Sequence, residues 1–237
     1  MTLQIFSNFR STAIATALSL AVTIVAPASA METGSGQIAK FEQQYLRFVI
    51  DHHYGALRMT ELAAGTNVHR APAILPSEGT APTPGFRATI AKASLDEIKS
   101  MARRDNRVQR EEILTAQRML MMWYRTTHTP ALSASAQEMI ALLERAAPGA
   151  QFDKTFLRHM SHHHFEVLAP SLRCVVGANL SHGELQRYCE GIVDAQTMEI
   201  DEMRHLLCER YADCHFQPFQ GLGAHPMVTG PRSGTAN

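Results

Sequence analysis

The chain has 237 residues, which is enough for one domain with a sizeable core or for two small ones. Its 22 lysine and arginine residues balance 22 aspartate and glutamate residues, so no polyanionic partner such as a nucleic acid is implied. No segment after residue 30 approaches the roughly 20 apolar residues of a transmembrane helix, so we expect no membrane span in the mature protein.

Residues 1–30 have the pattern of a secretory signal peptide. One positive charge, Arg10, precedes an apolar run, and the segment ends in the small residues Ala28-Ser29-Ala30, which suit a signal-peptidase site. The apolar run is shorter than a membrane span requires. We therefore expect an exported protein, periplasmic or secreted, once this segment is removed.

The rest of the chain is predicted to be all-helical, because apolar residues recur every three or four positions between breaks rich in glycine and proline. The breaks at residues 65–85 and 215–237 are predicted to be a loop and a disordered tail. A short helix is expected at about 135–147. Pro170 is expected to kink or end the helix in which it lies.

Two of the long helices carry capping-box patterns, in which side chains satisfy the orphan backbone donors of the first turn. The patterns are Ser94-x-x-Glu97 and Ser181-x-x-Glu184. We therefore predict that helices begin near Ser94 and near Ser181.

The four long helices are two copies of one hairpin, since residue 52 aligns with 163 and residue 112 with 199, offsets of 111 and 87. Two hairpins that each bury one face fit a bundle with approximate two-fold symmetry. The predicted fold class is therefore all-α, a ferritin-like four-helix bundle made of two pseudo-symmetric helical hairpins. The predicted boundaries are 31–214 for the bundle, about 38–128 and about 151–214 for the hairpins, and about 135–147 for the bridging helix.

Four cysteines, Cys174, Cys189, Cys208 and Cys214, lie in the last third of the chain. In an oxidising compartment an even number suggests two disulfides, and four cysteines allow three pairings. Cys174 with Cys189 would join the two helices of a hairpin, and Cys208 with Cys214 would fasten the chain end. Thiolate ligation of a soft metal is the weaker alternative, because no Cys-x-x-Cys spacing occurs.

Each copy places two adjacent histidines on its first helix and a Gln-x-x-Glu-Ile motif on its second. Neighbours on a helix diverge by about 100°, so we expect His52 and His163 at the centre of the apolar stripe and the following histidines on its flank. A carboxylate facing a core costs several kcal/mol unless a cation shared with imidazoles compensates it. The candidate metal ligands are His52, His53 and Glu112 in the first copy and His163, His164 and Glu199 in the second.

Methionines extend the candidate ligand set. Imidazole and carboxylate together suit Cu(II), Zn or Fe, and an added thioether shifts the preference toward Cu(I). Met59 follows the histidines on the first helix, and Met203 lies four residues after Glu199 and so shares its face. The first copy has Ala116 in place of Met203, and the second has Pro170 in place of Met59. We expect a copper ion as the cofactor, as Cu(I) or Cu(II), with Zn or Fe as alternatives.

At these residues the chain resembles the domain of unknown function 305 family. The members of this family are exported bacterial proteins with a ferritin-like helical architecture. The family pattern is Met-Ile-x-His-His-x-x-Ala followed by Gln-x-x-Glu-Ile-x-x-Met. Some members are associated with copper binding and copper tolerance, so the resemblance implies a copper role. The first half of the pattern occurs at residues 49–56 and 160–167, and the second half at residues 109–116 and 196–203. The chain departs from the pattern at Ala116, Ser161 and Pro170.

We expect a non-enzymatic protein that binds copper for sequestration, tolerance or delivery. One alternative is a ferritin-like di-metal redox enzyme, because Glu202-x-x-His205 has a suitable spacing, although the first copy has Thr115 and Arg118 at these positions. A second alternative is a metal-free helical interaction module whose histidines titrate near neutral pH. The expected partners are a metal ion and, if the chain self-associates, a second copy in a homo-oligomer.

Overall fold

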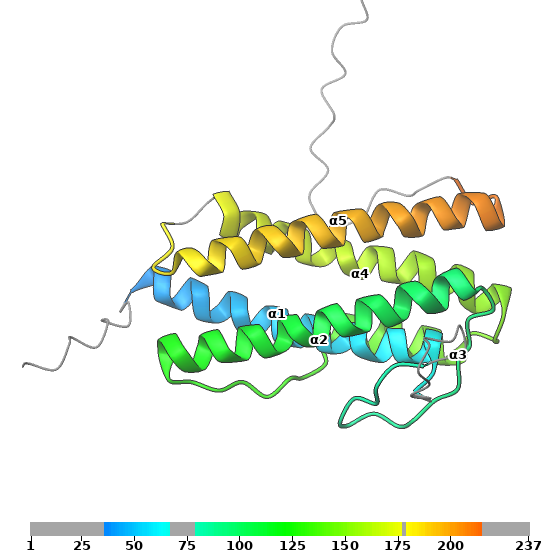
Figure 1. The fold of residues 1–237 in the computed structure, drawn as a ribbon, viewed down its shortest axis with the longest axis horizontal. Coiled ribbons are helices and arrows are strands. Elements are labelled where there is room, and N and C mark those ends of the chain that lie inside the picture. The colour runs from blue at the N-terminus through cyan, green and yellow to red at the C-terminus, as the bar shows by residue number, and fades with distance from the viewer. Residues whose placement is uncertain (1–35, 67–78, 177–178, 215–237) are drawn as a thin grey trace, which may run out of the picture. The chain divides into compact units, whose positions relative to one another are not determined.

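The computed structural model describes residues 36–66, 79–176 and 179–214, and this part of the chain is all-helical (Figure 1). It contains five α-helices and no strand, which confirms the predicted all-α class and a helical bundle. The predicted signal peptide and the predicted tail lie outside the described residues. None of the described helices is both long enough and apolar enough to cross a membrane. The helices are α1 (Gln37–Ala64), α2 (Asp96–Tyr124), α3 (Ala134–Arg145), α4 (Ala150–Val176) and α5 (Gly183–Tyr211).

The four long helices pack as two hairpins. α1 packs extensively along α2, α4 packs extensively along α5, and the hairpins meet where α1 contacts α4 (Figure 1). The short helix α3 joins the hairpins and lies against α1 and α4, close to the range predicted for a bridging helix. The hairpins thus coincide with the two sequence copies, while the ferritin-like two-fold relation stays a prediction.

Two hydrophobic clusters fill the interior, and buried polar residues lie between them along each long helix. One cluster takes the second half of α1, the start of α2 and of α4, and the end of α5. The other takes the first half of α1, the end of α2 and the start of α5. Apolar packing on both sides limits the contact of this polar layer with water and strengthens its electrostatic interactions. The polar layer comprises the partly buried Glu112 and the buried residues His52, His53, Asp105, Gln109, His163, His164, Gln196 and Glu199.

The capping box predicted at Ser94 and Glu97 is wrong. α2 begins at Asp96 without a side-chain cap, and Ser94 donates both its hydroxyl and its backbone N–H to Asp153 of α4, the latter at 3.0 Å. Glu97 accepts a hydrogen bond from Arg210 instead. A buried acid from the other hairpin therefore takes the donor that a local cap would have used.

The capping box predicted at Ser181 and Glu184 is wrong for the same reason. α5 begins at Gly183, and the buried Glu42 of α1 accepts the backbone N–H groups of Ser181 at 2.6 Å and of His182 at 3.1 Å. A carboxylate at this position also meets the positive end of the helix dipole. Each hairpin therefore binds the residues that directly precede a helix of the other.

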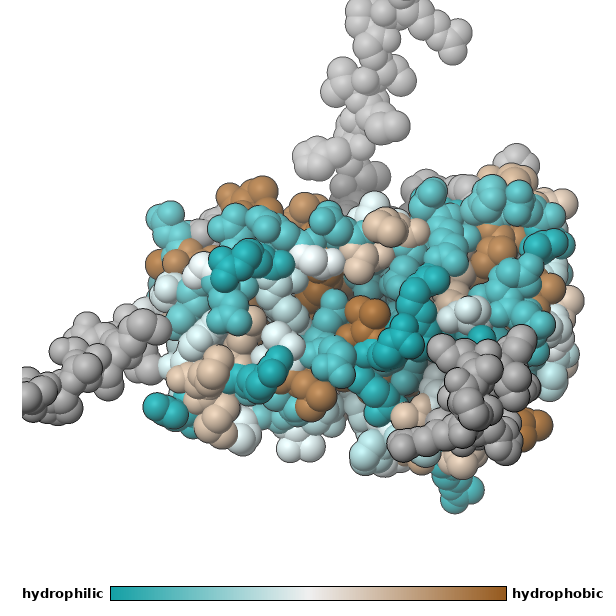
Figure 2. Space-filling model, in the orientation of Figure 1, coloured by the Kyte–Doolittle hydropathy of each residue, from teal (hydrophilic) through white to brown (hydrophobic). Residues whose placement is uncertain are grey.

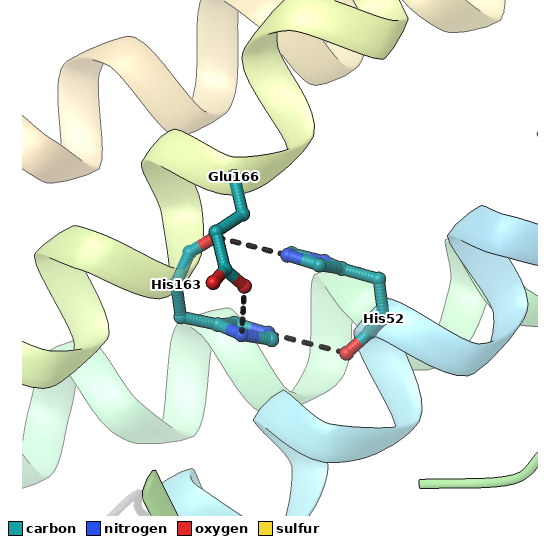
Figure 3. A group of neighbouring side chains, drawn as sticks. All are labelled: His52, His163 and Glu166. Atoms are coloured by element: carbon teal, nitrogen blue, oxygen red, sulfur yellow. Dashed lines mark hydrogen bonds and ion pairs between the residues drawn. The ribbon is translucent and has the colours of Figure 1, made fainter. Parts of the chain in front are cut away.

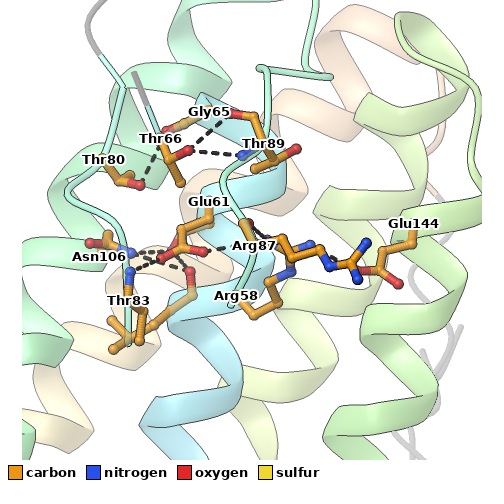
Figure 4. Close-up of polar contacts among 12 residues, drawn as sticks. Arg58, Glu61, Gly65, Thr66, Thr80, Thr83, Arg87, Thr89, Asn106 and Glu144 are labelled. Atoms are coloured by element: carbon orange, nitrogen blue, oxygen red, sulfur yellow. Dashed lines mark hydrogen bonds and ion pairs between the residues drawn. The ribbon is translucent and has the colours of Figure 1, made fainter. Parts of the chain in front are cut away.

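The segment that joins α1 to α2 is held against α1 by polar contacts (Figure 4). The buried carboxylate of Glu61 accepts the backbone N–H of Thr83 at 2.7 Å, and Arg58 donates to the backbone carbonyl of Arg87 at 2.8 Å. The described residues of the loop predicted at 65–85 are non-helical, as expected. The part of this connection that follows the undescribed residues is therefore anchored to α1.

The four cysteines form two disulfides within the second hairpin. Cys174 of α4 is bonded to Cys189 of α5, and Cys208 is bonded to Cys214 at the end of α5. No cysteine is free, so thiolates do not add to the candidate ligands. Pro170 does not end α4, which continues past it to the first disulfide.

Candidate metal centre

All four histidines of the two adjacent pairs are buried in the polar layer. His52 and His53 lie on α1 and His163 and His164 on α4, with exposed fractions of 6%, 0%, 1% and 0%. α1 is covered by α2 on one side and α4 on another, and α4 by α5 and α1. Two neighbours that diverge by about 100° can therefore both face protein.

His52 and His163 stack on each other beside Glu166 (Figure 3), and the ligand atoms of these three residues all lie within 4.8 Å of one another. The part of His52 and His163 in metal binding stays a prediction. Their rings stack with centroids 3.8 Å apart and planes 5° apart. Nε2 of His52 donates to the His163 carbonyl at 2.9 Å, and Nε2 of His163 donates to the His52 carbonyl at 3.1 Å. Burial lowers the pKa of both histidines well below 6.5, so both rings are neutral. Their proton is on Nε2 because a carbonyl only accepts, which leaves the lone pair on Nδ1.

His53 is the histidine that meets the carboxylate of the first copy. Its Nε2 lies 2.9 Å from Oε2 of Glu112. Its Nδ1 lies 3.4 Å from Nδ1 of His52, which can only accept, so neutral His53 carries its proton on Nδ1 and a lone pair on Nε2. Two electron-rich atoms then face each other and require a proton or a cation between them. Ligand atoms that each lie about 2.0–2.2 Å from one ion stand roughly 3 Å apart, which matches this spacing.

The second copy repeats this contact and adds an acid from the first hairpin. Nε2 of His164 lies 2.9 Å from Oε2 of Glu199 and 3.7 Å from Oδ2 of Asp105 on α2. The ligand atoms of these three residues all lie within 4.8 Å of one another. Burial raises the pKa of Asp105 to about 7 against the opposing effect of His164. Burial alone would lower the pKa of His164, but Asp105 and Glu199 raise it above 6.5.

Asp105 was not identified as a ligand from the sequence. The duplicated motif does not mark it, because the position that corresponds to it in α5, at the offset of 87, is Ile192. Asp105 is 3% exposed, and its Oδ1 accepts from Gln109 at 2.5 Å. The signal that could have found it is a single acid on the apolar stripe of a helix, where an unpaired charge is costly.

The polar layer also holds most of the buried side-chain atoms that lack a hydrogen-bond partner. Eight such atoms occur in the part of the chain that the structure describes, and six of them belong to this layer. Native interiors leave few polar atoms unpaired, since each costs about 1–3 kcal/mol. All six can offer a lone pair to a cation: Nε2 of His53, Nδ1 of His163, Nδ1 of His164, Oε2 of Glu112, Oε1 of Gln109 and Oε1 of Gln196.

The two methionines predicted as ligands are buried in one hydrophobic cluster. Met59 is 0% exposed and Met203 is 1% exposed, and the cluster also contains Met101 and Met160. Met203 lies one helical turn beyond Glu199 on α5. The thioethers therefore come from both hairpins, and their part in metal binding stays a prediction.

The Glu-x-x-His pair behind the di-metal alternative faces solvent. Glu202 pairs with Arg104 and is 43% exposed, and His205 pairs with Glu209 and is 68% exposed. Glu202 and His205 therefore do not contribute ligands to a di-metal site inside the bundle. The α2 and α5 face on which these residues lie is largely hydrophilic (Figure 2), and a groove between the two helices reaches Glu199.

Comparisons with known proteins agree with this fold. The family described as domain of unknown function (DUF305) matches residues 87–207, which leaves the His52–His53 pair outside the match. The solved structure of CopM in the Cu(I)-bound form is 20% identical with a TM-score of 0.52, and the alignment covers 72% of this chain and 97% of that one. CopM in the Cu(II)-bound form gives the same values. CopM in the Ag-bound form obtained by soaking is 20% identical with a TM-score of 0.51, and the alignment covers 72% of this chain and 96% of that one. No curated protein matches the chain.

Proposed function

This chain belongs to the domain of unknown function 305 family, and we propose on that premise that it is an exported, non-enzymatic copper-binding protein. Structures that share its fold hold Cu(I), Cu(II) or silver. The nitrogen and oxygen donors of the polar layer suit a copper ion as well. Residues 1–30, as a signal peptide, and two disulfides support a location in the periplasm or outside the cell.

The observation that carries the proposal is the set of unpaired buried lone pairs in the polar layer. Hydrogen bonds among these side chains leave the atoms unsatisfied, whereas one cation can bind imidazole, amide and carboxylate groups together. The first proposed centre has His53 and Glu112 as ligands. The second has His164 and Glu199 with Asp105, and there a bound ion would replace the proton that Nε2 of His164 shares with Oε2 of Glu199.

Two other predicted ligands receive different roles. His52 accepts the Nδ1 proton of His53 and thereby turns the other nitrogen of that ring toward the ion, as the outer partners of metal-bound histidines do. Met59 and Met203 are the proposed thioether donors, which would favour Cu(I) over Cu(II).

Copper titration of metal-free protein tests the proposal. Wild type should bind Cu(II), measured by calorimetry, and Cu(I), measured by competition with a chromophoric chelator, at micromolar concentration or below. Glu112→Gln and Glu199→Gln should each weaken one centre by at least about 10- to 100-fold, the loss that removal of even an outer partner of a metal ligand causes. The control is His205→Gln in the exposed His205–Glu209 pair, which should leave both titrations unchanged.

Indifference of the wild type to both oxidation states of copper would overturn the proposal. Tight binding of Zn(II) or Fe(II) with no competition from copper would instead reassign the metal. Sequestration and delivery differ in a host that lacks the protein: sequestration predicts greater copper sensitivity, and delivery predicts loss of copper from an exported acceptor enzyme.

A further inference from the structure

We propose that His162, His163 and Glu166 on α4 form a further metal site that takes a divalent ion such as Cu(II) from solvent. The proposal builds on the proposed copper-binding function, but the ligands are separate from those of the two carboxylate centres. Its donors are two imidazole nitrogens and a carboxylate without a thioether, a set that suits Cu(II) or Zn(II) better than Cu(I).

The inner ligand is His163, whose free nitrogen points toward Glu166 (Figure 3). Nδ1 of His163 is buried without a hydrogen-bond partner and lies 3.9 Å from Oε2 of Glu166. The lone pair is on this nitrogen because Nε2 donates its proton to the His52 carbonyl. Stacking against His52 holds the His163 ring in place, so the orientation of this inner ligand is fixed.

The outer ligands lie at the surface. Oε1 of Glu166 is 3.5 Å from Nε2 of His162, and the two side chains are 30% and 35% exposed. Ser135 of α3 donates to the same Oε1 at 2.8 Å, which orients the carboxylate as outer partners of metal ligands do. The two nitrogen–oxygen spacings, 3.5 Å to Oε1 and 3.9 Å to Oε2 of Glu166, must close by roughly 0.5–1 Å to reach the roughly 3 Å separation of atoms bound to one ion, a movement that the partly exposed Glu166 and His162 side chains must supply.

The bridging helix limits this arrangement to one copy. The position that corresponds to Glu166 in α1, at the offset of 111, is Gly55. A Cβ atom there would lie 2.8 Å from the Cβ of Ala136 on α3, so a longer side chain has no room. α3 therefore orients the carboxylate on α4 through Ser135 and excludes its counterpart on α1, and one such site per chain is expected.

Calorimetry and electron paramagnetic resonance with Cu(II) alone test the inference. Glu166→Gln should lose one equivalent of Cu(II), or bind it at least tenfold more weakly, together with a signal split by two nitrogens. His162→Ala should reduce that splitting to one nitrogen. The matched control is Glu209→Gln, which alters another histidine–glutamate pair at the same helical spacing but with no buried histidine beside it.

The double variant Glu112→Gln/Glu199→Gln separates this inference from the proposed function. It should retain the two-nitrogen signal. If Glu166→Gln binds as many Cu(II) ions as wild type with the same spectrum, the inference fails while the copper-binding function stands. If neither wild type nor any variant binds Cu(II) or Cu(I), both fail, and unchanged circular dichroism spectra verify that the variants are folded.

Discussion

The rings of His52 and His163 stack 3.8 Å apart where α1 meets α4, and each donates its Nε2 proton to the backbone carbonyl of the other. This reciprocal contact joins the two hairpins at the level of the polar layer. Burial keeps the pKa of both rings well below 6.5, so the contact is made by neutral imidazoles. The metal-free interaction module would require histidines that titrate near neutral pH, and these two histidines do not.

The metal-free protein is expected to lose stability as the pH falls below 6.5. The unfolded chain then protonates His52 and His163 while the folded state does not, so each histidine removes up to about 1.4 kcal/mol of unfolding free energy per pH unit. Urea unfolding at pH 7.5 and 5.5 measures the decline. His52→Gln keeps an N–H donor and should show a shallower decline than the exposed control His205→Gln. Equal declines in the two variants would contradict the prediction.

Copper affinity at the group formed by Asp105, His164 and Glu199 is expected to rise with pH through about 7. The pKa of Asp105, raised by burial to about 7, and that of His164, raised above 6.5 by Asp105 and Glu199, mean that the metal-free group holds protons. A bound ion must displace them, so affinity should rise about tenfold per pH unit for each proton released and level off above the pKa. Calorimetry in two buffers of different ionisation enthalpy counts the protons. Asp105→Asn should release fewer protons on copper binding. A copper affinity of the wild type that stays constant from pH 6 to 8 would refute the prediction.

Glu42→Gln is expected to cost about 2–4 kcal/mol of unfolding free energy, because it leaves buried donors facing an amide. Glu42 is 0% exposed and accepts from the backbone N–H groups of Ser181 and His182, from Nδ1 of His182 at 2.7 Å, and from the hydroxyl of Tyr124. Urea unfolding measures the loss. The exposed Glu209→Gln should change stability by less than about 0.5 kcal/mol. Similar small effects in both variants would show that these hydrogen bonds between the hairpins contribute little.

Two glycines in helices are expected to respond oppositely to alanine. A Cβ at Gly55 would lie 2.8 Å from the Cβ of Ala136, so Gly55→Ala should force α1 and α3 apart and cost about 1–3 kcal/mol. A Cβ at Gly191 of α5 would meet no atom within 4 Å, so Gly191→Ala should stabilise the helix by about 0.5–1 kcal/mol. Thermal unfolding of the two variants measures whether each substitution lowers or raises stability. Stabilisation by both would mean that α3 does not pack closely on α1.

The sequence was sufficient for the helical class, the paired hairpins, the bridging helix and the histidines and glutamates of the polar layer, but it did not single out Asp105 as a ligand. Apolar spacing and motif offsets carry this information, because helical periodicity depends on residues three or four positions apart. His53 with Glu112 and His164 with Glu199 were therefore found as sets of residues in facing helices. The pairing of Cys174 with Cys189 was one of three that the sequence allowed.

Only the tertiary structure decided which atoms meet. Contact between α1 and α4 turned His52 and His163 toward each other and left the next residue of each pair to face a carboxylate. Packing of the hairpins likewise brought Asp105 to His164 and set Glu42 against the start of α5. The rotation of a helix about its axis depends on the surfaces that pack against it, and those surfaces come from segments distant in the chain.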